Sequence, residues 1–233
     1  MDWPYEIAER DHDIQNPTSA EKIQLLGEYI RLDAASRVLD IACGKAGPAV
    51  LLASTHGCRI TGVEVRQLFA DEARARISAA GLEALVEIHT ADAREYALEP
   101  ETWDAALCLG AAFVWGDIGD AAAAMVPAVK RGGFVAIGEP YWKTPSRVDD
   151  GYVDLATTVD RFTATGLALT GIIAASEDDW DRYESPHWRA MEEWLATQTD
   201  AHDLRTKHER RRREHLTRRE QLGWAIFVGM TPH

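Results

Sequence analysis

The sequence predicts an α/β fold: a mostly parallel sheet with helices on both faces. Short runs of β-branched and apolar residues alternate with helix-like segments through the first part of the chain. Such a rhythm is typical of parallel strands joined by crossover helices. With 233 residues and 46% hydrophobic content, the chain is also long enough to bury one substantial core.

The first five strands are expected at Arg37–Ile41, Arg59–Val65, Leu85–Thr90, Trp103–Leu109 and Phe134–Glu139. Gly57, Gly81 and Gly132 each follow an apolar-periodic segment, so we expect them to end helices. Pro48 is expected in the first turn of a helix. These signals predict a Rossmann-like, doubly wound sheet.

Beyond Gly138 the rhythm changes. We expect a helix at Gly151–Thr165, a strand at Leu167–Ala174, a charged helical stretch at Asp178–Glu220 and a last strand at Trp224–Met230. The sheet is thus expected to have seven strands, with a helical insertion before the last one.

We expect a single domain over residues 1–233. Its parts are an N-terminal lid and first helix (1–33), a cofactor-binding core (34–140), and substrate-side helices with the last two strands (141–233). Residues Met1–Asn16 are polar with a few large aromatics, a composition typical of segments that close over a ligand and exclude water.

Composition and charge exclude several functions. A formal charge of −13 and a pI near 5.0 argue against nucleic acid, whose binding depends on Lys and Arg at phosphates. Three cysteines without C-x-x-C spacing indicate a reducing cytoplasm and suggest no metal site. The acidic start lacks the features of a signal peptide. No apolar run has the length of a membrane helix, so no membrane partner is expected.

The stretch V-L-D-I-A-C-G-K-A-G predicts a ligand loop after the first strand. Small residues at Ala42, Gly44, Ala46 and Gly47 let the backbone approach a ligand closely. The dinucleotide pattern G-x-G-x-x-G is only nearly met, which alone is a weak signal. Asp40 separates the alternatives, because a carboxylate there would repel a pyrophosphate but attract an ammonium or sulfonium group.

Two further carboxylates follow neighbouring strands. Glu64 at the tip of the second strand can accept hydrogen bonds from both hydroxyls of a ribose. Asp92 follows the third strand and could accept a hydrogen bond from an exocyclic amine such as that of adenine. Because parallel strands end at the same sheet edge, these residues predict a nucleoside ligand with a cationic group.

These residues resemble the class I S-adenosylmethionine-dependent methyltransferases. The motifs H-D-I-Q-N-P (His12–Pro17) and G-E-P-Y-W (Gly138–Trp142) resemble a bacterial branch of small-molecule methyltransferases whose substrates are mostly unassigned. The resemblance covers roughly residues 34 to 140 as a generic fold and implies S-adenosyl-L-methionine as the cofactor. It implies cofactor contacts at Asp40, Ala42, Gly44, Glu64, Val65, Asp92, Ala93 and Cys108.

The loop departs from the usual three alternating glycines, because Ala42 and Ala46 replace two of them. Alanine is tolerable there if its φ stays negative. For Lys45 we expect a solvated turn lysine, with a role as partner of the methionine carboxylate as the alternative.

Methyl transfer to a small-molecule acceptor mainly requires alignment of donor and acceptor. A general base is needed only if the acceptor arrives protonated, and the candidates are Glu139 and His12. The acceptor pocket is expected at Trp115, Tyr141, Trp142, Trp180 and Tyr183. Trp188 and Trp194 are expected in the core, and Lys207–His215 as a mixed-charge helix face.

Two alternatives stay open from the sequence. One is an NAD-dependent oxidoreductase on the same kind of sheet, which Asp40 and the imperfect glycine pattern disfavour. The other is a non-catalytic module that binds S-adenosylmethionine. The methylated atom and the oligomeric state are not determined by any of these residues.

Overall fold

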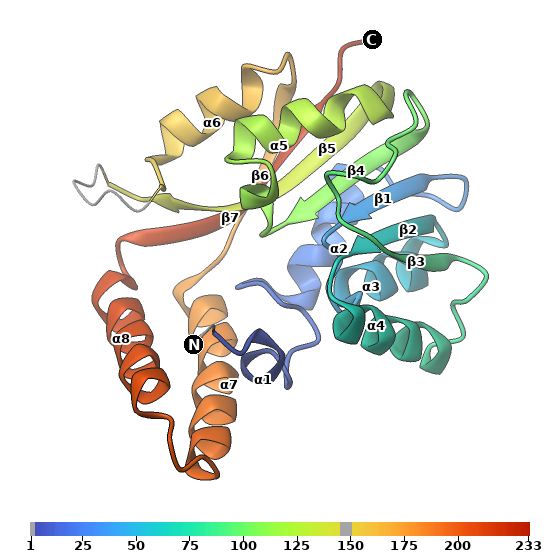
Figure 1. The fold of residues 1–233 in the computed structure, drawn as a ribbon. Coiled ribbons are helices and arrows are strands. Elements are labelled where there is room, and N and C mark those ends of the chain that lie inside the picture. The colour runs from blue at the N-terminus through green and yellow to red at the C-terminus, as the bar shows by residue number, and fades with distance from the viewer. Residues whose placement is uncertain (1–2, 145–150) are drawn as a thin grey trace.

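The structure of the protein, a computed structural model, describes residues 3–144 and 151–233. Its strands are β1 (Arg37–Ile41), β2 (Arg59–Glu64), β3 (Val86–Thr90), β4 (Trp103–Leu109), β5 (Val129–Trp142), β6 (Ala168–Ala174) and β7 (Leu222–Met230). Within the described residues, these seven strands form one sheet in the order β3-β2-β1-β4-β5-β7-β6 (Figure 1).

The sheet is parallel except at β7. Strand β1 pairs in parallel with β2 and β4, and the parallel pairing continues to β3 and β5. Strand β7 is inserted antiparallel between β5 and β6. The predicted doubly wound, mostly parallel seven-stranded sheet is therefore confirmed. Strand order reverses between β1 and β4, and ligands of such sheets bind at this switch point.

Helices cover both faces of the sheet. The helices of the described residues are α1 (Tyr5–Ala8), α2 (Ala20–Tyr29), α3 (Gly47–His56), α4 (Gln67–Ala79), α5 (Ile118–Met125), α6 (Leu155–Thr163), α7 (Glu177–Ala196) and α8 (His202–Arg218). In Figure 1, α2, α3 and α4 lie on one face and α5 and α6 on the other. Alternation along β1 sends Val38 into the core on the first face and Leu39 into the core on the second.

Most of the expected start and stop signals act as predicted. Pro48 lies in the first turn of α3, and Gly57 ends that helix in the left-handed conformation with φ of 69°. Gly81 follows α4 in the same conformation. The expectation for Gly132 is wrong. This glycine lies inside β5 with φ of 72°, because the strand begins earlier than its apolar run indicates.

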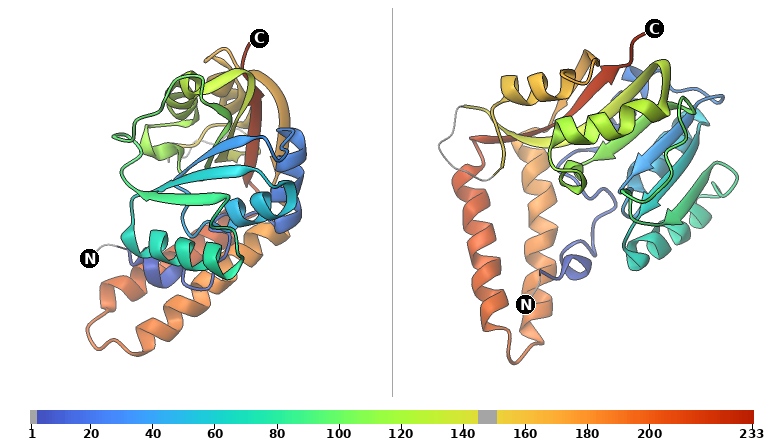
Figure 2. Two further views of the ribbon diagram at one scale, coloured as in Figure 1. Left: turned by 90° about the vertical axis from the view of Figure 1, so that its right-hand side faces the viewer. Right: turned by 45° about the horizontal axis from the view of Figure 1, so that its top comes forward.

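The charged stretch expected at residues 178–220 forms α7 and α8, separated by a short turn. A capping box between Ser176 and Asp179 begins α7. Figure 2 shows the two helices extending away from the sheet side by side, with α1 against α7. A small third core joins these three helices, and it includes Ala8, Met191 and Leu204, with Trp194 packed against it as predicted. In the described part of the chain, no helix is both long and apolar enough to cross a membrane.

Strand β7 is an interior strand, with β5 on one side and β6 on the other. Seven of its nine residues are buried, all except the first and the last. Phe227 is fully buried, and its ring centroid lies 6.1 Å from that of Tyr141 and 6.4 Å from that of Phe162. This aromatic cluster joins β5, β7 and α6.

We therefore expect Phe227→Ala to lower the free energy of unfolding by ~3–5 kcal/mol, because it leaves a cavity among these rings. Urea denaturation measures the change. The matched control is Leu216→Ala on α8, whose side chain is 62% exposed and whose loss should cost no more than ~0.5 kcal/mol. Equal effects of the two substitutions would contradict this account of the core.

Candidate active site

The loop between β1 and α3 has an unusual backbone. Ala42, Gly44 and Ala46 all have positive φ, at 53°, 55° and 59°. The condition of negative φ, under which alanine would be tolerated at these two positions, is therefore not met. Left-handed backbone at a residue with a Cβ costs roughly 1–2 kcal/mol, so the surrounding contacts must hold the loop in this shape.

The loop is small partly because the N-terminal segment packs directly on it. A Cβ at Gly44 would lie 2.1 Å from Gln15 Oε1, and a Cβ at Gly47 would lie 1.9 Å from the carbonyl oxygen of Asp13. Residues 3–18 precede α2 and cross the loop; we call this segment the lid. Glycine at positions 44 and 47 therefore leaves room for the backbone and side chains of the lid, as well as for a ligand.

Lys45 binds the backbone of the lid through its side chain. Its side chain is 1% exposed, and its Nζ donates to the carbonyl oxygens of Glu9 and Arg10 at 2.9 and 3.1 Å. Its ammonium also pairs with Glu72 at 2.8 Å. Our expectation of a solvated turn lysine is therefore wrong. The alternative role at a methionine carboxylate is not supported either, because the ammonium is already engaged by the lid and α4.

Asp40 lies at the carboxyl end of β1, buried beneath the loop at 2% exposure. Burial, with a smaller contribution from the nearby Glu64, raises the pKa of Asp40 to about 7. Its Oδ2 is buried without a hydrogen-bond partner among the described residues. A buried carboxylate with a spare acceptor suits a cationic ligand group, which would lower the pKa again.

Glu64 at the end of β2 has a different environment. Its carboxylate accepts hydrogen bonds from the backbone N–H of Gly44 at 3.0 Å and of Arg66 at 2.7 Å. Burial raises the pKa of Glu64, and these two donors oppose that shift. Each carboxylate oxygen has a second lone pair, so Glu64 can still accept from a ligand.

Asp40, Ala42, Gly44, Glu64 and Val65 meet at one cavity of about 370 Å³. Its other walls come from the lid, the loop after β1 with the start of α3, the start of α4, the loop after β4, and α7. The residues concerned are Tyr5, Glu9, Asp13, Gln15, Asn16, Cys43, Pro48, Arg66, Phe69, Leu109, Gly110, Ala111, Phe113, Val114 and Tyr183. The volume lies within the range of small-molecule sites.

A second cavity of about 300 Å³ adjoins the first, sharing Ala42, Val65, Phe113 and Val114 with it. Asp92 and Ala93 line this second cavity. A hydrogen bond from Arg94, 3.0 Å between Nε and Oδ1, is the largest cause that lowers the pKa of Asp92 to about 2. Asp92 is thus an ionised acceptor that Arg94 already occupies in part.

His12 does not line the cavity. It is buried at 6% exposure, and its Nε2 lies 2.7 Å from the carbonyl oxygen of Tyr183, so this nitrogen is the N–H donor. Burial lowers the pKa of His12, with a further contribution from the neighbouring His187. The ring of His12 therefore connects the lid, to which it belongs, with α7.

The G-E-P-Y-W motif lies outside both cavities. Strand β5 continues to its end, with Tyr141 opposite Gly223 and Trp142 opposite Leu222 on β7. Tyr141 packs over Gly223 against Phe227, and Trp142 is 3% exposed. Our expectation that both rings line the acceptor pocket is not met, because pairing with β7 draws the motif into the sheet.

Glu139 lies on the same strand and is absent from the linings of both cavities. Burial is the main cause that raises the pKa of Glu139 to about 7, and Asp117 adds to it. Cys108 is fully buried in the core on β4, and the residues that follow it, Leu109 to Ala111, line the cavity instead. The burial of its thiol also raises the pKa of Cys108 to about 12.

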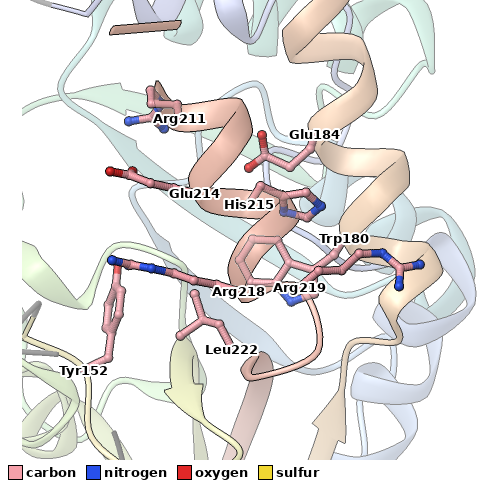
Figure 3. A pocket seen from close by; sticks show the side chains of 9 residues that line it. All are labelled: Tyr152, Trp180, Glu184, Arg211, Glu214, His215, Arg218, Arg219 and Leu222. Atoms are coloured by element: carbon pink, nitrogen blue, oxygen red, sulfur yellow. The ribbon is translucent and has the colours of Figure 1, made fainter. Parts of the chain in front are cut away.

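The other three aromatic residues expected in the acceptor pocket lie in three different environments. Tyr183 lines the cavity, and its hydroxyl donates to Glu9 Oε1 at 3.0 Å. Trp115 packs on the core, whereas Phe113, 75% exposed, is at the cavity. Trp180 lines a separate space of about 200 Å³ between α7 and α8, among the charged side chains of Arg211, Glu214 and Arg218 (Figure 3).

Sequence reasoning missed Glu9 and Phe113 as individual site residues. Tyr5 was one of the aromatic residues expected to cap the site, and Gln15 entered only as part of the H-D-I-Q-N-P motif. Phe113 had a local signal, since it lies in the loop after β4, at the same sheet edge as Asp40.

Comparison with known proteins gives three findings. A family described as a methyltransferase domain matches residues 38–133. The uncharacterized protein YjhP of Escherichia coli is 30% identical over 245 aligned residues, which cover 98% of each chain. A 27-O-demethylrifamycin SV methyltransferase of Amycolatopsis mediterranei is 25% identical, and the match covers 70% of this chain and 63% of the relative.

Among solved structures, a S-adenosylmethionine-dependent methyltransferase of Thiobacillus denitrificans superposes with a TM-score of 0.89 and is 30% identical. The match covers 99% of this chain and 100% of that one, which was crystallised with S-adenosyl-L-homocysteine. The likeness therefore includes the lid and the α7–α8 pair as well as the sheet.

The burial of Asp40 leads to a pH prediction for S-adenosylhomocysteine, whose ammonium group is expected to lie against this carboxylate. Free Asp40 titrates at about 7, and an ammonium partner lowers that pKa, so binding below pH 7 requires loss of a proton. Affinity should therefore rise with pH between about 5.5 and 7.5, by at most roughly tenfold per pH unit.

Calorimetry at three pH values in this window tests the prediction. Asp40→Asn should bind more weakly at the upper end and should show a flatter pH dependence, because the titrating group is gone. An identical slope in both proteins would place the titration, and the ammonium, elsewhere.

Proposed function

The chain belongs to the S-adenosylmethionine-dependent methyltransferases, and we propose that the small-molecule acceptor of its methyl group binds on the lid side of the larger cavity. The cofactor is S-adenosyl-L-methionine. Membership of this family removes the NAD-dependent oxidoreductase that the glycine pattern left open. The observation that carries the proposal is that one cavity joins the acids at the strand ends to the aromatic rings of the lid and α7.

We propose that the cofactor binds across both cavities. The methionine end would lie in the larger one, with its ammonium near the unpartnered Oδ2 of Asp40. The ribose hydroxyls would donate to Glu64, and the adenine would extend toward Asp92 and Ala93 in the smaller one. The shared lining of the two cavities supports this continuous seat.

The acceptor would face the sulfonium from the opposite wall. Tyr5 from the lid, Phe113 from the loop after β4 and Tyr183 from α7 form this wall together with the carboxylate of Glu9. Aromatic rings that close on a small space suit a small organic acceptor and attract the cationic methyl donor. The named acceptor of the Amycolatopsis relative, a small molecule, supports the same class for this chain.

The chemistry then requires little beyond alignment. The sulfonium already activates the methyl carbon, so an in-line approach of the acceptor atom supplies much of the reduction in barrier. The lid excludes water from this approach, and the contacts of Lys45 hold the lid against the loop. Neither Glu139 nor His12 lines the cavity, so we assign neither of them the role of general base.

The working environment is inferred from charge and cysteine state. Cys43, Cys58 and Cys108 are all free and buried, which supports a reducing compartment such as the cytoplasm. The formal charge of −13 supports a small molecule over nucleic acid as the acceptor.

The decisive experiment compares the two places where the acceptor could bind. A pool of small metabolites is incubated with the protein and S-adenosylmethionine, and release of S-adenosylhomocysteine identifies an acceptor. We expect Tyr5→Ala to lower kcat/KM for that acceptor by ~10–100-fold, with a smaller loss of cofactor affinity, because it removes one face of the acceptor wall.

The matched control is Glu139→Gln, which changes charge but not shape on the strand that carries G-E-P-Y-W. It should leave kcat/KM within about threefold of the wild type. If Glu139→Gln abolishes turnover while Tyr5→Ala retains it, the acceptor binds beside β5 and our placement is wrong.

A further inference from the structure

Three buried side chains meet where the lid touches α7. Glu9 and His12 come from the lid, and His187 comes from the middle of α7. One potential ligand atom from each lies within 4.8 Å of the other two. Glu9 Oε2 is 3.5 Å from His12 Nδ1, and Glu9 Oε1 is 3.0 Å from His187 Nε2. The lid and α7 therefore present two imidazoles and one carboxylate to a common point.

These ligand atoms are buried and have no hydrogen-bond partner. Glu9 Oε2, His12 Nδ1 and His187 Nε2 all lack one in the described part of the chain. The three residues are 6%, 6% and 8% exposed. Leaving buried polar atoms unpaired is costly, so a cluster of three that converge calls for a ligand that takes lone pairs.

Each ring has a polar group near its outer nitrogen, a hydrogen-bonded carbonyl for His12 and a nearby carboxylate for His187. His12 Nε2 donates to the carbonyl oxygen of Tyr183, which leaves Nδ1 with a lone pair directed at Glu9. His187 Nδ1 lies 3.9 Å from Glu184 Oε2. Metal-binding histidines almost always have such an outer carbonyl or carboxylate partner, which sets the tautomer and the ring orientation.

We propose that Glu9, His12 and His187 bind a divalent transition metal of the zinc class, which joins the lid to α7 at the wall of the active-site cavity. Two imidazoles and one carboxylate are a known ligand set of zinc sites. The separations of 3.5 Å between Glu9 Oε2 and His12 Nδ1 and of 3.0 Å between Glu9 Oε1 and His187 Nε2 suit neighbouring ligands of a tetrahedral ion with bonds of about 2.0–2.1 Å. Magnesium and calcium prefer oxygen ligands and are disfavoured.

The position of Glu9 connects this site to the cavity. Its side chain lines the cavity and also accepts a hydrogen bond from the hydroxyl of Tyr183. An ion held by Glu9 would thus lie next to the acceptor wall, a consequence that rests on the proposed function. The metal site itself does not depend on it.

A proton offers the competing arrangement. Burial lowers the pKa of His187, but the carboxylates of Glu184 and Glu9 outweigh it and raise that pKa to about 9. A protonated His187 could then pair with Glu9 without any metal. Direct binding measurements distinguish the two arrangements, because only a metal site takes up zinc with defined stoichiometry.

The test uses the full chain, treated with EDTA and dialysed, in a zinc titration against a chromophoric chelator. We expect one Zn²⁺ per chain, and a loss of affinity of ~100-fold or more in His12→Gln and in His187→Gln. Added Co²⁺ should give the visible absorption of a low-coordinate site. The matched control is His208→Gln, since His208 is a buried histidine of α8 outside the cluster, 3.3 Å from Glu192.

A second measurement does not depend on the folding of variants. Crystals of the wild type soaked in zinc should show an anomalous peak within about 2.0–2.2 Å of the three ligand atoms. No stoichiometric zinc, no peak at the cluster, or equal affinity in His187→Gln and His208→Gln would overturn the metal site. All of these readouts are independent of turnover, so failure of the proposed acceptor site would leave them unchanged.

Discussion

The buried ammonium of Lys45 is the constraint on which the site depends. A charge taken out of water must find compensating partners, and it finds them in Glu72 on α4 and in two carbonyl oxygens of the lid. The backbone of the same residue adds two more links, because its N–H donates to Gln15 and its carbonyl accepts from Arg76. The loop, the lid and α4 are therefore all connected through Lys45.

This arrangement explains the strained loop above Asp40. Left-handed backbone at Ala42 and Ala46 is costly, and it persists because the lid and α4 hold Lys45 between them. The lid in turn covers the cavity and positions Glu9 and His12 against α7. Cofactor loop, cavity roof and the Glu9–His12–His187 cluster are thus parts of one connected structure, formed by segments far apart in the sequence.

The sheet and the acids at its edge could be predicted because their signals are local. Apolar runs marked the strands, and Asp40 and Glu64 followed directly from the ends of β1 and β2. The wrong predictions concern residues whose environment depends on segments far away in the sequence. Pairing with β7 draws Tyr141 and Trp142 into the sheet, and strand alternation turns Cys108 into the core. No local pattern shows that Lys45 is covered by the lid, or that His187 lies beside His12.

The central claim is that Lys45 holds the lid over the cavity, and hydrogen exchange of the lid amides in Lys45→Met tests it most directly. A hydrogen bond from a charged donor is worth ~1.5–3 kcal/mol, so loss of the two that Lys45 donates to Glu9 and Arg10 should make the amides of residues 8–12 exchange ~100-fold faster or more, while those of β1 and β4 keep their protection. Lys130→Met is the control, since Lys130 pairs with Asp104 at 2.7 Å on a half-exposed surface. Unchanged exchange of the lid in Lys45→Met would contradict the account.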